Sequence, residues 1–194
     1  MSKVAIKGAD TGTGVFTLES PATNTDRTLV LPDEAGTVLT TAGVPASAMP
    51  AGSVIQVVNA RNNTALNTTS TSWVSTGTTA SITPTSSSST ILVITNEDIH
   101  GDVDNDSQDV RGYYRLLRDS TTILENNNGT TSEIISRGGQ QGMQSKSIVY
   151  EDNPATTNTI TYKTEVKYAS SSGSRNLRVN YDKLGTITLM EIAG

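Results

Sequence analysis

The residues with the clearest potential for chemistry form an acidic cluster at Asp102, Asp104 and Asp106. Carboxylates on alternate residues can converge oxygen ligands on a hard cation, and these three match the first ligands of the helix–loop–helix calcium motif. However, Ser107 stands where that motif needs glycine, Tyr113 stands where it needs glutamate, and no helical pattern flanks the cluster. Two interpretations therefore stay open, a Ca²⁺ site at the three aspartates and a solvated acidic loop, and the loop is favoured.

Groups that could form a catalytic site are few. His100 is the only histidine, so a Ser-His-Asp triad would have to use it, and no Gly-x-Ser-x-Gly elbow supplies a nucleophile. Three copies of His100 could meet on an axis and bind a metal, but a lone loop histidine is more often solvated. Asp98, Asp102, Glu151 and Asp152 could supply a carboxylate pair for glycoside hydrolysis, yet the chain lacks the repeats of a solenoid groove. We therefore predict that the protein is not an enzyme and uses no cofactor, with Ca²⁺ as the one exception left open.

The composition indicates β structure and excludes several classes of function. Ser and Thr make up 53 of the 194 residues, and Gly adds 16; threonine favours strands, whereas serine and glycine favour turns. The 14 basic and 19 acidic residues give a net charge of −5, which repels a phosphate backbone, so we predict no nucleic-acid partner. There is no cysteine for a disulfide or a thiolate. No apolar run reaches the length of a membrane span, so we predict no membrane insertion.

The second part of the chain has the pattern of an antiparallel β-sandwich. Residues 54–58 and 91–94 are continuous apolar runs of the kind found in sandwich cores. Apolar and polar residues alternate along residues 160–168, which predicts a strand with one buried face. The polar residues 118–121 lie between two apolar runs and predict a hairpin. Together these strands predict an all-β, jelly-roll-like domain over residues 51–194.

The aromatic residues admit two interpretations. Trp73 and the six tyrosines could stack on sugars. Tyr162 and Tyr168, however, fall on the apolar side of an alternating strand, where packing in the core is the default. We therefore expect these two tyrosines to be structural.

Residues 1–50 have a different character. Two short strand-like runs, 15–18 and 28–31, are separated by turn residues, and residues 40–52 are small and rich in Pro and Gly, which predicts a linker. Neither run can close a core alone. Several copies wrapped together would bury these apolar residues, so we predict an extended segment that associates with itself.

Two stretches of this segment resemble a known family. Residues 14–21 read Gly-Val-Phe-Thr-Leu-Glu-Ser-Pro, and residues 26–39 read Asp-Arg-Thr-Leu-Val-Leu-Pro-Asp-Glu-Ala-Gly-Thr-Val-Leu. They resemble a segment that recurs in tail-fibre and other virion proteins of tailed bacteriophages, especially marine ones. The resemblance implies an extended, intertwined segment that attaches to the virion and forms a homotrimer. The residues that would carry this role are Val15, Phe16, Leu18, Arg27, Leu29, Leu31, Pro32, Gly36 and Val38.

The second part of the chain is similar to the globular knob of the same proteins at residues 52–58, 71–74, 80–84, 91–93 and 189–193. The resemblance implies a short tail-fibre-type homotrimer of the virion, made in the host cytoplasm. Its N-terminal segment would bind other virion proteins, and its knob would project toward a glycan or protein of the host surface. A head fibre or capsid decoration protein is an alternative, as is a free carbohydrate-binding, lectin-like module.

Overall fold

The computed structural model describes residues 46–101, 110–125, 134–136, 143–169, 176–181 and 183–194, together with 11, 13, 22, 24–26, 28 and 44. The chain divides into two compact units, Met1–Leu39 and Thr40–Gly194. The described strands belong to the second unit. Its described residues form strands and one 3-10 turn, η1 (Ala46–Ala48), and contain no α-helix. None of the helical structure in this part of the chain could span a membrane.

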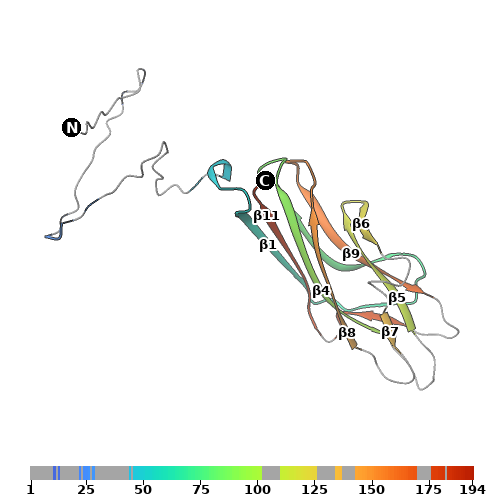
Figure 1. Cartoon of the computed structure of the whole chain (residues 1–194). Coiled ribbons are helices and arrows are strands. Elements are labelled where there is room, and N and C mark those ends of the chain that lie inside the picture. The colour runs from blue at the N-terminus through green and yellow to red at the C-terminus, as the bar shows by residue number, and fades with distance from the viewer. Residues whose placement is uncertain are drawn as a thin grey trace. The chain divides into compact units, whose positions relative to one another are not determined.

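Two antiparallel sheets face each other (Figure 1). Sheet A contains β1 (Val54–Asn62), β2 (Leu66–Thr68), β4 (Thr90–Gly101), β8 (Met143–Asp152), β10 (Leu177–Val179) and β11 (Gly185–Ile192). Sheet B contains β3 (Val74–Ile82), β5 (Val110–Arg118), β6 (Thr121–Glu125), β7 (Ile134–Ser136) and β9 (Ile160–Ala169). The predicted antiparallel β-sandwich is confirmed, whereas its jelly-roll-like character and the extended N-terminal segment stay predictions. So does the domain boundary near residue 50.

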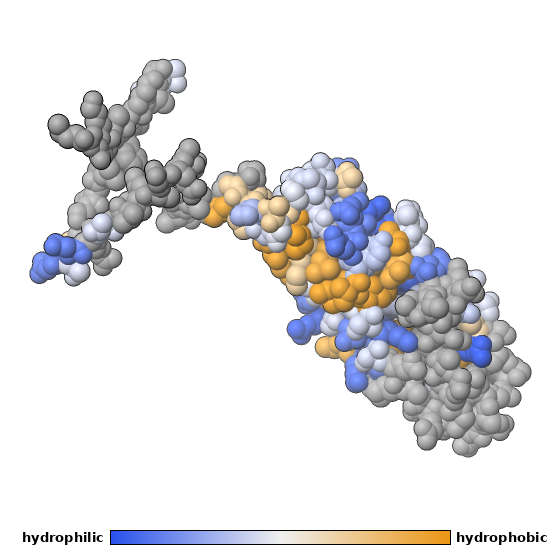
Figure 2. Space-filling model, in the orientation of Figure 1, coloured by the Kyte–Doolittle hydropathy of each residue, from blue (hydrophilic) through white to orange (hydrophobic). Residues whose placement is uncertain are grey.

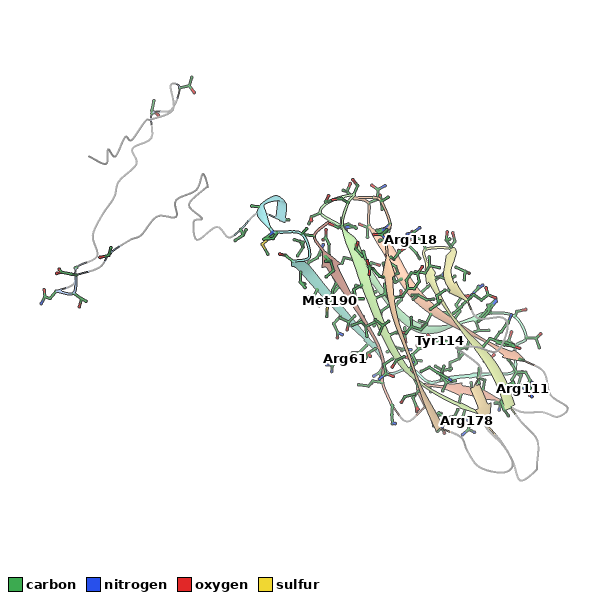
Figure 3. The ribbon with its side chains drawn as sticks, in the orientation of Figure 1. Arg61, Arg111, Tyr114, Arg118, Arg178 and Met190 are labelled. Carbon is green, nitrogen blue, oxygen red and sulfur yellow. The ribbon has the colours of Figure 1, made fainter. Side chains whose placement is uncertain are left out.

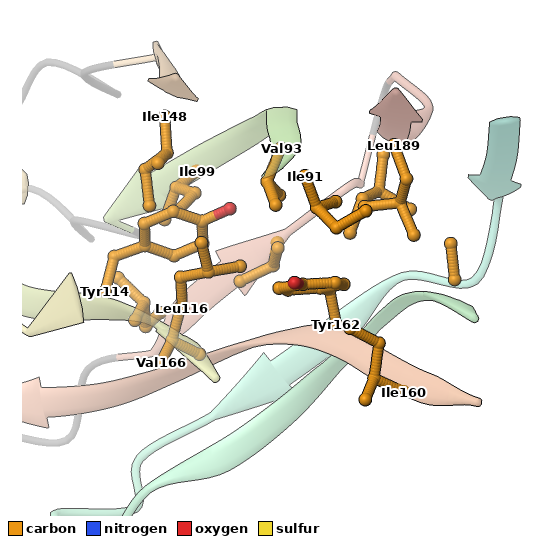
Figure 4. Close-up of a cluster of buried hydrophobic side chains, with 14 of the residues drawn as sticks. Ile91, Val93, Ile99, Tyr114, Leu116, Ile148, Ile160, Tyr162, Val166 and Leu189 are labelled. Carbon is orange, nitrogen blue, oxygen red and sulfur yellow. The ribbon is translucent and has the colours of Figure 1, made fainter. Parts of the chain in front are cut away.

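The core lies between the sheets and follows the alternation of the sequence. Along β9, every second residue from Ile160 to Tyr168 is buried, and Tyr162 is fully enclosed. Ile91 and Val93 on β4 face it from sheet A (Figure 4). The interpretation of Tyr162 and Tyr168 as core residues is therefore confirmed.

The predicted hairpin joins β5 to β6. Leu116 pairs with Leu124, and Arg118 pairs with Thr121 across a two-residue turn. Asp119 in this turn has φ of 53°, a left-handed conformation that aspartate tolerates better than most residues. Its carboxylate oxygen Oδ1 also accepts a 2.9 Å hydrogen bond from the amide of Thr161, which ties the turn to β9.

A layer of buried polar side chains crosses the middle of the core. Glu97 on β4 points inward and is 1% exposed. Its Oε1 accepts a 3.1 Å hydrogen bond from the Thr164 hydroxyl of sheet B, and that hydroxyl lies 2.6 Å from the hydroxyl of Thr76. Beside them, the Tyr114 and Thr95 hydroxyls are 3.1 Å apart. Hydrogen bonding within this layer offsets part of the cost of burying polar groups.

The end of the sandwich at the C-terminus holds the chain that enters β1. The amide of Gly52 donates to the carbonyl of Ala193 at 2.7 Å, and the amide of Ala193 donates to the carbonyl of Ser53 at 2.9 Å. Nearby, the buried carboxylate of Glu191 accepts hydrogen bonds from the backbone amide and hydroxyl of Thr85 and from the amide group of Gln56, at 2.6–2.7 Å. The later part of the predicted linker is thus fastened to the sandwich.

Candidate binding surfaces

The outer face of sheet B carries an aromatic–cation cluster, defined here as Trp73, Tyr113, Arg115, Glu165 and Lys167. The strand register explains it: Tyr113 lies opposite Lys167, Arg115 lies opposite Glu165, and Trp73 immediately precedes β3. The Lys167 ammonium is 4.5 Å from the centroid of the Trp73 ring and 5.1 Å from that of Tyr113. The Arg115 guanidinium is 4.3 Å from the centroid of Trp73. All these distances are within the range of cation–π attraction.

Ion pairs hold Arg115 in this cluster. Its Nε and Nη2 donate to Oε2 of Glu165 at 2.9 and 2.5 Å, and its Nη1 lies 3.7 Å from Oε2 of Glu125. Two cations therefore lie over the Trp73 indole, on π surface that a stacking sugar would need. A sugar could use the covered surface only by displacing one of them. The arrangement favours a structural role for the cluster.

His100 does not lie in a solvated loop, so that expectation is wrong. Strand β4 continues to Gly101, and His100 is 6% exposed. Its Nε2 is 2.5 Å from Oδ2 of Asp98, which is itself 2% exposed. The polar residues at this end of β4 stay in the strand because their side chains have hydrogen-bond partners. The contact between Asp98 and His100 is one example. The imidazole that a metal shared between copies would need is therefore engaged with this carboxylate.

The acidic residues considered for glycoside hydrolysis do not pair among the described residues. Asp98 and Ile91 are seven residues apart on β4, and Ile91 lies opposite Asp152, so Asp98 and Asp152 are separated by about 23 Å along the strand. Glu151 is exposed on the outer face of sheet A, whereas Asp152 is buried on the inner face. Asp98 and Asp152 are too far apart to act as a catalytic pair, whose carboxyl groups lie about 5 to 9.5 Å apart. Glu151 and Asp152 point to opposite faces of the sheet, so they cannot act together on one substrate.

The outer face of sheet A carries an apolar patch, named here the apolar face: Val57, Leu92, Ile94, Val149, Met190 and Ile192. Two rows of paired residues form most of it, one linking Val57, Met190 and Leu92, and the next linking Ile94 to Val149, while Ile192 lies opposite Thr90 in a third row. Val57 is 55% exposed and Val149 is 67% exposed. Hydrophobic atoms gather over β1, β11 and β4 in Figure 2, and Figure 3 places Met190 there, with Arg61 at the margin. An apolar patch bordered by polar residues is a typical interaction site.

The residues predicted from the sequence to attach the chain to the virion or to bind Ca²⁺ fall outside the described residues. These are Val15, Phe16, Leu18, Arg27, Leu29, Leu31, Pro32, Gly36 and Val38 for attachment, and Asp102, Asp104 and Asp106 for Ca²⁺. Both assignments stay predictions. Within the part of the chain that the structure describes, no three His, Cys, Asp or Glu side chains gather as a metal site would require.

Sequence reasoning missed both surfaces described above. The aromatic–cation cluster joins three strands that are far apart in the chain, so no local pattern shows it. The apolar face had a local signal, because Leu92 and Ile94 interrupt the polar–apolar alternation expected of a strand with one wet face. Continuous apolar runs such as residues 91–94 indicate burial on both faces.

Comparison with known proteins gives remote likenesses. No protein-family model matches the chain, and no curated protein matches it. Among solved structures, a chain of the T13 IBDV viral particle is similar with a TM-score of 0.39 and 11% identity, over 72% of this chain and 36% of that one. A chain of the infectious bursal disease virus VP2 subviral particle is similar with a TM-score of 0.34 and 13% identity, over 72% and 38%. This chain spans little more than a third of those viral proteins, and likeness this remote carries no argument about its function.

Proposed function

We propose that the chain is a structural protein of a bacteriophage virion, a short tail-fibre-type homotrimer that is not an enzyme. Residues 1–50 attach it to other virion proteins and join the three copies, and the β-sandwich projects from the particle. The observation that carries this proposal is the resemblance of residues 14–21 and 26–39 to the attachment segment of phage virion proteins.

The fold of the second unit supports the proposal. The stretches similar to phage knobs, residues 52–58, 80–84, 91–93 and 189–193, coincide with β1, the end of β3, β4 and β11. These strands form the framework on which the loops are mounted. Loops on a rigid β framework are common places for recognition, which fits a knob that contacts the host surface.

The oligomer is tested by native mass spectrometry of the full chain. We expect a species of three times the 20.4 kDa of one chain. Charges placed in the predicted attachment segment, Phe16→Asp together with Leu29→Asp, should dissociate it, whereas Asn158→Asp on an exposed loop of the sandwich should not. A wild-type chain that is monomeric at micromolar concentration would contradict the trimer.

The location is tested on particles of a phage that encodes the chain. Gold-labelled antibody against the sandwich should decorate the tail, and deletion of residues 1–50 should leave the particles unlabelled. Label on the capsid would instead identify the head-fibre or decoration alternative. The absence of label from intact particles would contradict a virion role altogether.

A free carbohydrate-binding module is the second candidate, favoured by the position of Trp73 and Tyr113 on the outer face of a sheet. A glycan array with the full chain and its Trp73→Ala variant separates it from the first. Glycan binding that needs Trp73 but survives deletion of residues 1–50 would favour the module. The covered π surface of Trp73 leads us to expect no such binding.

A further inference from the structure

We propose that the apolar face of sheet A is the surface through which copies of this chain pack against one another. This inference rests on the homotrimer of the proposed function and adds where the sandwiches meet. The partner that binds this face is a second copy of the chain. Three features of the face support a second copy as its partner: its exposure, its low charge and its connection to the N-terminal segment.

The apolar face lies on the outer side of sheet A, where apolar residues do not contribute to the core of the sandwich. Ile148 and Tyr150 already supply the inward contacts of β8, and the residue between them, Val149, is 67% exposed. A hollow of about 320 Å³ lies on the same outer face, lined by Thr90, Leu92, Glu151, Ile192 and Ala193. A projecting valine and a hollow on one face allow two such faces to fit into each other, and close packing of this kind excludes water from interfaces.

The charge distribution favours this face over the opposite one for contact between copies. The two rows at its centre contain one charged side chain, Glu151, at the β8 edge, and Arg61 lies in the following row on β1. Two copies can therefore meet without taking many charges out of water. On the outer face of sheet B, by contrast, Arg115, Glu165 and Lys167 would have to be desolvated together, which is costly.

The connection between sheet A and the N-terminal segment also favours a second copy of the chain as the partner. Strand β1 belongs to sheet A and directly follows the stretch fastened at Gly52 and Ser53. If residues 1–50 join the copies, each sandwich stays tethered to its neighbours at an effective concentration that is about millimolar for short linkers. A modest apolar contact is then sufficient, so the face need not be large enough to hold free subunits together.

The test uses single cysteines in the full chain, which has none of its own. Val149→Cys places a thiol on the apolar face, and Ser81→Cys places one at an exposed position on the outer face of sheet B. Each variant is treated with a short bis-maleimide at low protein concentration, and native mass spectrometry first verifies that it is oligomeric. We expect at least a fivefold higher yield of cross-linked chains for the Val149 variant. Thiol labelling should also be slower at residue 149 than at residue 81.

The outcomes separate this inference from the proposed function. An oligomer in which residue 149 cross-links no better than residue 81 overturns the face and leaves the homotrimer standing. The same holds if residue 149 is protected from labelling but never cross-links, because the face would then be covered by the chain's own segment. A monomeric wild-type chain overturns both. Val149→Lys gives an independent check: it should abolish the slow labelling of a Val57→Cys thiol without changing the unfolding midpoint by more than a few degrees.

Discussion

The hydroxyl of Tyr162 donates a 2.6 Å hydrogen bond to Oδ2 of Asp152, and so joins β9 of sheet B to the end of β8 in sheet A. Nη1 of Arg118 lies 2.9 Å from both oxygens of the same carboxylate. Tyr162 is fully buried and Asp152 is 7% exposed. One carboxylate of sheet A thus receives a phenol and a guanidinium from sheet B, which makes the contact between the sheets sensitive to the protonation of Tyr162.

Alkaline pH will destabilise the fold through Tyr162. Burial, and after it the neighbouring Asp152, raises the pKa of Tyr162, because a phenolate there would be desolvated and close to a negative charge. The unfolded tyrosine, with a pKa of about 10, loses its proton first. This contribution to the free energy of unfolding is therefore complete below pH of about 10 and is lost as pH rises toward the folded pKa.

Urea unfolding at several values between about pH 8 and pH 11 measures this effect. Tyr162→Phe should be less stable than wild type at the lower pH, by about 1.5 to 3 kcal/mol for the lost hydrogen bond to a charged group. Its stability should then fall less steeply with pH. Parallel slopes for the two proteins would show that Tyr162 is not the group responsible.

Acid pH will destabilise a second contact, at Glu191. Burial raises the pKa of this carboxyl, but hydrogen bonds from Gln56, Ser89 and Thr85 lower it by more, so its net shift is downward. The contribution of Glu191 to stability is then present above the unfolded value of about 4.3 and is lost as pH falls through the folded pKa. Glu191→Gln should cost about 2 to 3 kcal/mol near neutral pH, because an amide cannot accept all these hydrogen bonds.

The matched control for Glu191 is Glu151→Gln on the outer face of sheet A, where the side chain is exposed. Denaturant midpoints at pH 7 and at about pH 3.5 compare the variants. Glu191→Gln should lose less stability on acidification than wild type, while Glu151→Gln should behave like wild type. Equal losses for all three proteins would remove Glu191 as the acid-sensitive group.

Gly185 leaves space that its neighbours occupy. A Cβ at this position would lie 2.5 Å from Oγ1 of Thr78 and would also clash with the side-chain amide of Asn180. Both neighbours are at most 2% exposed, so they cannot swing into solvent. We expect Gly185→Ala to lower the free energy of unfolding by about 1 to 3 kcal/mol.

A second substitution tests the cause. Thr78→Ala in the Gly185→Ala background removes one of the clashing atoms, so the double variant should be more stable than the sum of the single changes predicts. Gly52→Ala is the comparison for backbone strain alone, because Gly52 has φ of +86° but nothing within 4 Å of the Cβ position. Additive single changes would mean that the two side chains do not compete for this space.

Lys167 stabilises the aromatic–cation cluster. Lys167→Met keeps the length of the side chain and removes its charge, so we expect a loss of about 0.5 to 1 kcal/mol. Trp73 is the only tryptophan, so its fluorescence emission reports the change directly. The control is Lys163→Met on the same face of β9, whose ammonium lies 3.9 Å from Glu165. The assignment fails if Lys163→Met shifts the emission as much as Lys167→Met does.

The sequence predicted the parts of the fold that have a local pattern. Alternation over residues 160–168 gave β9 and its buried face, and the polar residues 118–121 gave the β5–β6 hairpin, because period and turn chemistry act within a few residues. It did not predict that β4 continues through Glu97 to His100. Those polar residues resemble a loop until their partners are known, and one partner, Thr164, lies 67 residues further along the chain.

The candidate surfaces depend even more on register. Lys167 meets Trp73 and Tyr113 only because β9 lies between β3 and β5 in sheet B. Charge and residue type alone suggested that Trp73 could stack on sugars, and could not show that cations would cover it. The attachment residues and the acidic loop were assigned from the sequence and stay predictions.

The polar layer of the core has a consequence for strand pairing. The inner face of β4 is apolar at Ile91, Val93 and Ile99, so sliding the strand by two residues would still present apolar side chains to sheet B. Such a slide would, however, carry Glu97 away from the Thr164 hydroxyl and leave a carboxylate in an apolar site, at a cost of several kcal/mol. Several alignments of β4 would bury similar amounts of apolar surface. The hydrogen bond between Glu97 and Thr164 favours one of them. A buried carboxylate, which adds no hydrophobic stabilisation, is therefore what distinguishes the native pairing.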